Sequence, residues 1–152
     1  MANSQAMATS FKGELLNAYH NFSATNPART INTADSFKAA LYLASASMGA
    51  ASTAYTATGE VTGTGYTAGG VAITSWNAPT TSGTTGYTTP TASITYTSVT
   101  LTTAFDAVLI YNNTQGNRAV SVHTFGSQTV TAGTFTLTMP TNAAGTALIN
   151  IA

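Results

Sequence analysis

Few side chains in this sequence can carry acid–base or nucleophilic chemistry. There is no cysteine, and the groups that ordinarily titrate between about pH 3 and pH 8 are His20, His123, Glu14, Asp35, Glu60 and Asp106. A hydrolytic triad needs a histidine that contacts both a serine and a carboxylate. His123 shares one face of a predicted strand with Ser121, but the chain has no Gly-x-Ser-x-Gly nucleophile elbow. We therefore predict that the protein is not an enzyme.

The same groups do not form a pattern typical of a metal or glycosidase site. The two histidines and four carboxylates never occur at the close spacing that metal ligands adopt. The pair of carboxylates that glycoside hydrolysis requires would have to come from different segments of the chain. The sequence therefore predicts no metal and no cofactor.

A glycine-rich stretch matches a nucleotide-binding fingerprint in form only. Residues 63–68 read Gly-Thr-Gly-Tyr-Thr-Ala, but a dinucleotide site needs a helix directly afterwards and an acidic residue about twenty positions later. Here a predicted strand over 71–76 follows, and residue 88 is threonine. We expect these glycines to provide positive φ angles or a close backbone approach in a tight loop.

Four aromatic residues, Tyr55, Tyr66, Trp76 and Tyr87, are concentrated in the loop-rich middle of the chain. Buried, they would cap the core. Exposed, they would form a protein interface or a platform on which sugar rings stack. The sequence leaves these three alternatives open.

The N-terminal twenty residues are predicted to form an arm followed by a helical turn. Residues 1–10 are small and polar, and we expect them to be extended. Phe11, Leu15, Leu16 and Tyr19 lie on one face of a short helix. So short a helix needs a packing partner, which we expect to be the domain or a neighbouring subunit.

Charge is scarce and balanced along the whole chain. The 152 residues include four basic and four acidic side chains, whereas an average domain carries roughly 25% charged residues. Nucleic-acid binding needs clustered Lys and Arg, and a transmembrane helix needs about twenty apolar residues in a row. The sequence has neither, and its first ten residues do not resemble an export signal. Its 32 threonines suit a β-protein with a neutral, hydroxylated exterior.

Short strands separated by turn residues predict an all-β fold. We expect about eight strands in one domain over residues 11–152, arranged as a β-sandwich or jelly roll. A change in apolar parity predicts a bulge near Thr97, and residues 77–91 are predicted to be a turn-rich loop. Turns are predicted at 112–117, at Gly126 and at Gly133. The strands are expected at residues 35–43, 71–76, 93–103, 104–111, 118–125, 129–131, 134–138 and 148–151.

The chain resembles a family of small tailed-bacteriophage structural proteins. The matching stretches are Phe11-Lys-Gly-Glu-Leu-Leu, Asp35-Ser-Phe-Lys-Ala-Ala-Leu-Tyr, residues 53–70 with their Gly-Glu-Val-x-Gly-x-Gly-Tyr block, and Leu109-Ile-Tyr-Asn-Asn-Thr-Gln-Gly-Asn-Arg-Ala-Val. This family is that of the capsid cement, or decoration, proteins of jelly-roll type. Asp106 and His123 depart from the residue types expected there.

The resemblance implies a non-enzymatic protein on the outer surface of the virion. Such proteins bind the major capsid protein at junctions between capsomers, often as dimers or trimers. It implies no nucleic-acid, membrane or cofactor partner. Residues 1–10 are hypothesised to order on a neighbouring subunit. The interface candidates are Phe11, Leu15, Leu16, Tyr19, Tyr55, Tyr66 and Trp76.

A second reading is a tail- or fibre-associated β-sandwich that binds a host carbohydrate. An exposed Trp76 and Tyr87 above a polar groove would favour this reading. For a neutral surface that is covered by identical copies and a shell, we expect the few charged residues to lie at the edges of the contact surface or in pairs, and not at its centre.

Overall fold

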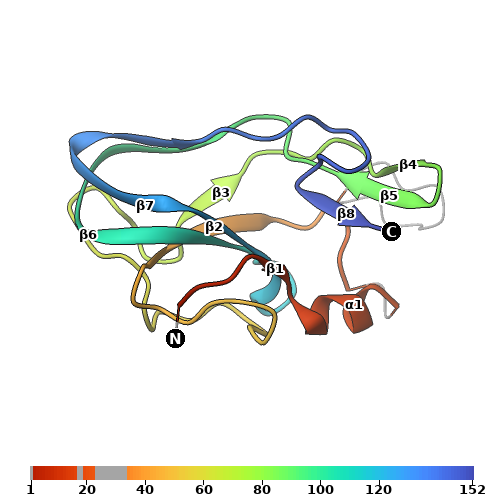
Figure 1. Cartoon of the computed structure of the whole chain (residues 1–152), viewed down its shortest axis with the longest axis horizontal. Helices are drawn as coiled ribbons and strands as arrows, with labels where there is room; N and C mark the ends of the chain where they lie inside the picture. The colour runs from red at the N-terminus through yellow and green to blue at the C-terminus, as the bar shows by residue number, and fades with distance from the viewer. Residues whose placement is uncertain (1, 17–18, 23–33) are drawn as a thin grey trace.

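The computed structural model describes residues 2–16, 19–22 and 34–152, and it confirms the all-β prediction. Its elements are β1 (Ala6–Met7), α1 (Thr9–Leu16), β2 (Phe37–Leu43), β3 (Val71–Ile73), β4 (Thr80–Ser82), β5 (Thr85–Thr88), β6 (Ile94–Asn112), β7 (Arg118–Leu137) and β8 (Ile149–Ile151). They form a five-stranded antiparallel sheet in the order β1-β7-β6-β2-β3 and a three-stranded sheet in the order β4-β5-β8. Figure 1 shows the smaller sheet at one end of the long hairpin β6–β7.

The hairpin β6–β7 builds both layers of the sandwich. Its strands are 19 and 20 residues long, and they bend so that one half folds over the other (Figure 1). The register shifts between Tyr96 and Val99, where Ser98 has a positive φ of 54°. The predicted bulge near Thr97 is therefore confirmed. The predicted turn at 112–117 is also confirmed, with positive φ at Gly116 and Asn117.

Two predicted turns are absent from β7, which continues through Gly126 and Gly133. Neither glycine has a positive φ, so both have the extended backbone that any residue can adopt. The β-branched threonines around them favour strand. In the same way, residues 93–103 and 104–111, predicted as separate strands, join in β6.

The prediction of a loop over residues 77–91 is wrong in part. It contains the hairpin β4–β5, with Ser82 opposite Thr85 and a positive φ at Gly83. Strand β5 pairs with β8, with Thr88 opposite Ile149. Threonine-rich residues on both sides of a glycine turn explain the hairpin.

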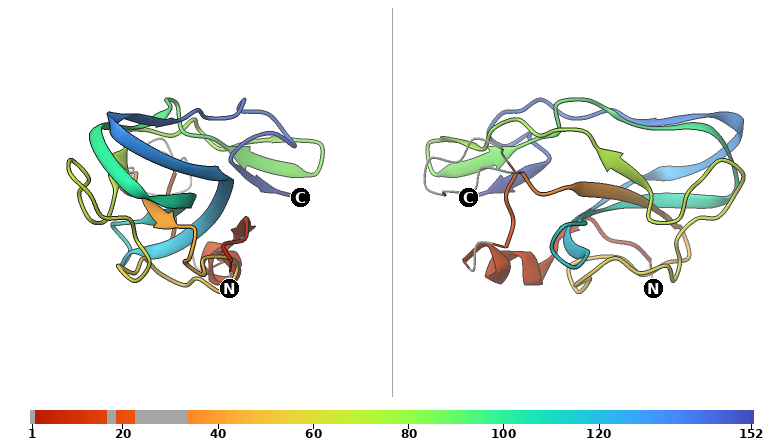
Figure 2. Two further views of the ribbon diagram at one scale, coloured as in Figure 1. Left: turned by 60° about the vertical axis from the view of Figure 1, so that its left-hand side comes forward. Right: turned by 180° about the vertical axis from the view of Figure 1, so that it is seen from behind.

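The N-terminal arm lies on its own chain (Figure 2). Ala6 and Met7 pair with Val122 and Ser121 of β7, and Ala8 is fully buried. The Nδ2 of Asn3 donates to Oδ1 of Asp106 at 2.6 Å. Asp106 therefore fixes the arm over the sheet.

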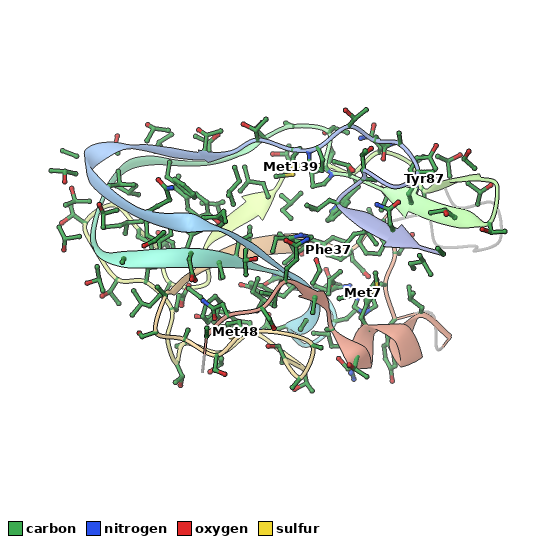
Figure 3. The ribbon with its side chains drawn as sticks, in the orientation of Figure 1. Met7, Phe37, Met48, Tyr87 and Met139 are labelled. Atoms are coloured by element: carbon green, nitrogen blue, oxygen red, sulfur yellow. The ribbon has the colours of Figure 1, made fainter. Side chains whose placement is uncertain are left out.

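The core lies between the two halves of the hairpin and β2. Phe37, Leu41, Phe105 and Leu109 are each at most 1% exposed, and Figure 3 shows Phe37 in the interior. Phe105 makes an edge-to-face contact with Phe135 of the opposite layer, with ring centroids 5.0 Å apart. The loops and the smaller sheet that form the candidate sites pack around this core.

Candidate functional site

An apolar groove lies where the smaller sheet faces helix α1. Its volume is about 440 Å³. Phe11 and Leu15 of α1 line one side, and Tyr87, Ile149 and Ile151 line the other. Figure 3 shows Tyr87 on the smaller sheet. The groove can receive an apolar side chain or a short apolar segment.

A hydrogen-bonded carboxylate positions the segment 19–22 that completes the groove. Asp35 Oδ2 accepts from the backbone N of Asn21 at 2.9 Å and from Nδ2 of Asn112 at 2.8 Å. The same Nδ2 lies 3.1 Å from Nδ1 of His20. Asp35 therefore links this segment to the end of β6.

Aromatic rings support the groove from beneath. Phe22 stacks on Phe37 with centroids 4.5 Å apart, and Trp76 meets the edges of both rings. Trp76 and Tyr87 are both half-buried. Carbohydrate binding would be favoured by an exposed pair of aromatic rings above a polar groove. In the described residues, Trp76 and Tyr87 do not form such a pair.

A second cluster surrounds Glu60, which is 6% exposed. Tyr66 Oη donates to Glu60 Oε1 at 2.7 Å, and the backbone N of Gly69 donates to the same oxygen at 2.8 Å. Tyr55 Oη donates to Oε2 at 2.7 Å. Tyr66 Oη also accepts from the backbone N of Leu41 at 3.0 Å. These bonds tie the glycine-rich loop to strand β2.

The Glu60 cluster keeps its tyrosines protonated. Burial, followed by the hydrogen bond to Glu60, raises the pKa of Tyr55 to about 12. The same two causes raise the pKa of Tyr66 further. Burial also raises the pKa values of Tyr42 and Tyr96. A protonated phenol donates to a carboxylate, so the cluster is a stable set of donors around one acceptor rather than an acid–base pair.

Glycines allow this loop to lie directly on the sheet. A Cβ on Gly70 would lie 1.7 Å from the carbonyl O of Ala39, and one on Gly65 would lie 2.2 Å from that of Ser98. Both glycines have positive φ. The predicted role of the glycine-rich stretch, positive φ and close backbone approach, is confirmed.

A serine–histidine pair lies beside the N-terminal arm. Ser121 Oγ is 2.8 Å from Nε2 of His123, and both residues line a cavity of about 380 Å³ with Met7 and Asn150. Burial lowers the pKa of His123 to about 4. Ser121 is only 2% exposed. No carboxylate among the described residues lines this cavity, so a triad is not assembled here.

The predicted interface residues separate into two regions. Phe11 and Leu15 line the groove, with Trp76 packed behind it. Tyr55 and Tyr66 belong to the Glu60 cluster, which is bonded to β2 through Leu41 and does not line the groove. The side chain of Leu16 lies outside the described residues.

Tyr19 is the most accessible of these candidates. It is 40% exposed, and the guanidinium carbon of Arg118 lies 4.4 Å from its ring centroid. A cation above an aromatic face is a favourable contact. Tyr19 therefore packs against Arg118 and remains partly accessible to solvent.

Sequence reasoning did not identify Phe22, Ile149 and Ile151 as lining residues or Glu60 as the centre of a cluster. Ile149 and Ile151 belong to a strand whose partner, β5, was not predicted. For Glu60, the available signal was a lone carboxylate flanked by Tyr55 and Tyr66. Its burial depends on tertiary packing.

The described surface carries almost no charge. Of the five charged residues whose burial is described, Glu60 is buried and Asp35, Lys38, Asp106 and Arg118 are half-buried. None of the five is exposed. Threonines fill the solvent-facing positions of the outer hairpin, among them Thr95, Thr97, Thr102, Thr134 and Thr136.

Within the described residues, no group of three or more His, Cys, Asp or Glu side chains could hold a metal ion. No helix in that part of the chain is long and apolar enough to cross a membrane. Comparisons with protein-family models, curated proteins and solved structures find no match to this chain. Its function is therefore inferred from its own residues.

Proposed function

We propose that this chain is a non-enzymatic structural protein of a tailed-bacteriophage virion, which binds the outside of the head and bridges subunits of the major capsid protein. The observation that carries the proposal is the neutral exterior: none of the five charged side chains whose burial is described is exposed. The resemblance to decoration proteins over residues 11–16, 35–42, 53–70 and 109–120 supports the same function.

A neutral surface favours permanent contact with a large assembly. Burying an unpaired charge at an interface is costly, and this surface has few charges to bury. Hydroxyl and apolar contacts are individually weak. Many copies on one shell would add their effects, because each bridging copy binds at more than one point.

The apolar groove is the proposed contact for a side chain of the capsid subunit. Ile151 lines it and is 42% exposed, which makes it one of two large apolar side chains described as exposed. The other is Tyr19. Both would become buried when a partner occupies this end of the molecule.

The test is to mix the purified protein with expanded phage heads that lack it. The bound copies per head and the resistance of the heads to heat are then measured. We expect saturable binding over the whole shell and more heat-resistant heads. Absence of binding, or binding only at the tail vertex, would overturn the proposal.

Two variants locate the contact. Ile151→Asp places a charge at the rim of the groove, and we expect it to weaken head binding by about tenfold. Thr58→Asp places the same charge on an exposed loop residue and should leave binding unchanged. Equal binding by both variants would exclude the groove as the contact while leaving the head-binding result intact.

A further inference from the structure

The long strand β7 has one edge that is only partly covered. Near its start, Ala119 N donates to Thr53 O, Ala8 N donates to Val120 O, and β1 pairs with Ser121 and Val122. Beyond Val122, no described strand pairs with this edge as far as Leu137. The sheet order β1-β7-β6-β2-β3 places only the two-residue strand β1 beyond β7.

In its last paired residues, 135–137, this edge lacks the features by which proteins usually block edge-to-edge pairing. Charged side chains and proline on an edge strand discourage pairing with another chain. Residues 119–139 contain no Lys, Arg, Asp, Glu or Pro. The register of β6 and β7 shifts at four places between Tyr96 and Ala107, and Ala132 has a positive φ. These irregularities lie before the regular segment in which Phe135 to Leu137 pair with Tyr96 to Ile94.

Partly exposed apolar side chains accompany the open edge. They lie on β7 or shortly after it, and they are Phe125, Val130, Phe135, Leu137, Met139 and Leu148. A cavity of about 160 Å³ lies among Phe125, Leu137, Met139 and Leu148. Figure 3 shows Met139 just beyond the end of β7. This edge therefore offers both unpaired backbone groups and apolar surface.

We propose that a second copy of this chain pairs with this edge, antiparallel and two-fold symmetric, through residues 134–138. In this segment Thr134, Thr136 and Thr138 are exposed and alternate with the half-buried Phe135 and Leu137. When the strand is reversed about Thr136, Thr134 faces Thr138 of the second copy and Phe135 faces its Leu137. Threonine then meets threonine on one face and apolar meets apolar on the other, as cross-strand pairing favours.

The self-complementary pattern is the reason to choose a second copy as the partner. A two-fold axis brings the same surface of each copy together, so a neutral edge meets a neutral edge with no charge left unpaired. A different partner would need a strand of matching alternation, and the edge has no charge with which to select one. The proposal is independent of any role in a virion.

Single-cysteine cross-linking tests the pairing directly, because the chain has no cysteine. Facing residues in an antiparallel sheet have Cα atoms about 4.5–5.5 Å apart, and disulfides form at Cα separations of about 4.4–6.8 Å. Thr134→Cys, Thr136→Cys and Thr138→Cys are made separately in the full chain and oxidised. We expect a covalent dimer from Thr136→Cys, because Thr136 faces itself across the axis, and none from Thr134→Cys or Thr138→Cys. Thr102→Cys, at an exposed position of β6, should stay monomeric on a denaturing gel.

The second measurement introduces opposite charges at Thr136. The molar mass of the protein, at about 100 µM, is measured by light scattering. We expect the wild-type chain to be a dimer, and Thr136→Lys and Thr136→Glu each to weaken dimerisation at least about tenfold. An equimolar mixture of the two should restore the dimer, and Thr102→Lys should not affect it. A monomeric or trimeric wild type, or a dimer insensitive to both Thr136 variants, would overturn the proposal.

Discussion

Glu60 is a buried carboxylate whose charge is stabilised by hydrogen bonds. Two phenol groups and one backbone N–H donate to its two oxygens at 2.7–2.8 Å. Hydrogen bonds to a charged acceptor are stronger than neutral ones, and an unpartnered carboxylate would be very costly at this depth. Glu60 thus has a structural role, in contrast to the catalytic roles for which the carboxylates were first considered.

Replacing Glu60 with glutamine tests this role. Glutamine keeps the size of the side chain but turns one acceptor oxygen into an NH₂ donor, which would face a tyrosine hydroxyl that also donates. We expect Glu60→Gln to lower the free energy of unfolding by about 2–3 kcal/mol. Urea denaturation at pH 7, followed by circular dichroism, measures the change.

Single phenol deletions provide the controls for Glu60. Tyr55→Phe removes one donor, from a side chain that is already half-buried, and should cost about 1 kcal/mol. Combined with Glu60→Gln, it should cost less than the sum of the two, because both changes remove the same bond. Additive effects would show that the bond between Tyr55 and Glu60 contributes nothing.

His123 predicts a specific pH dependence of stability. Its pKa is lowered to about 4 by burial, whereas in the unfolded chain it is near 6.5. Between these values the unfolded state binds a proton that the folded state does not, so stability falls as the pH decreases from about 6.5 to about 4. We expect a loss on the order of 2 kcal/mol across this window, measured by urea denaturation at each pH.

A variant that lacks His123 separates this effect from carboxylate titration. His123→Gln keeps a polar side chain beside Ser121 and removes the titrating group, so its stability should change less between pH 6.5 and pH 4. Thr129→Gln, at an exposed position of the same strand, is the matched control and should retain the wild-type slope. The attribution fails if His123→Gln keeps the full pH dependence.

At the scale of elements, periodicity and turn chemistry predicted much of the fold. Alternating apolar residues located β2, and the Asn- and Gly-rich turn at 112–117 located the hairpin β6–β7. The parity change near Thr97 located a bulge that bends the strand. These features are local, so the sequence carries them directly.

The errors arose where a local signal was read without its tertiary context. Gly126 and Gly133 were read as turns, yet both lie within β7, where the register with β6 shifts but the strand continues. The groove was not predictable, because it depends on how the smaller sheet packs against α1 and on residue 22. Contacts between segments that are distant in the sequence do not produce a hydrophobic periodicity, so they cannot be predicted from a single sequence in this way.

Gly70 and Gly126 form a matched pair that tests the packing of the glycine-rich loop. Gly70→Ala would place a Cβ 1.7 Å from Ala39 O at a φ of +70°, whereas a Cβ on Gly126 meets nothing within 4 Å. We expect Gly70→Ala to cost about 3 kcal/mol or more, and Gly126→Ala to change stability by less than about 0.5 kcal/mol. Thermal unfolding compares the two. Similar melting temperatures would show that the loop does not rest on β2 as described.

At the scale of the whole molecule, the few charged residues that the structure describes lie away from the exposed surface. Eight charged residues could have been spread over the surface, but those described are half-buried or buried. Asp35, Glu60 and Asp106 each accept a hydrogen bond from a neutral donor inside the chain. These three carboxylates therefore hold segments of the fold together, and exposed threonines supply much of the polar surface.

The neutral exterior predicts that binding to a phage head depends little on salt. Screening weakens interactions between exposed charges over about 10 Å at 0.1 M ionic strength, and the described surface presents none of its charged side chains as exposed. We expect the affinity for heads to change by less than about threefold between 50 and 500 mM sodium chloride. Sodium sulfate should strengthen binding at equal ionic strength, because it favours the burial of apolar surface.

Copies bound per head, counted after sedimentation at each salt concentration, give the measurement. Thr58→Lys is the control variant. It adds one charge on an exposed loop, and its affinity for heads should depend on salt concentration as the wild-type affinity does. A fall in affinity of a hundredfold or more over this range would mean that charged side chains dominate the contact, and a neutral interface would then be wrong.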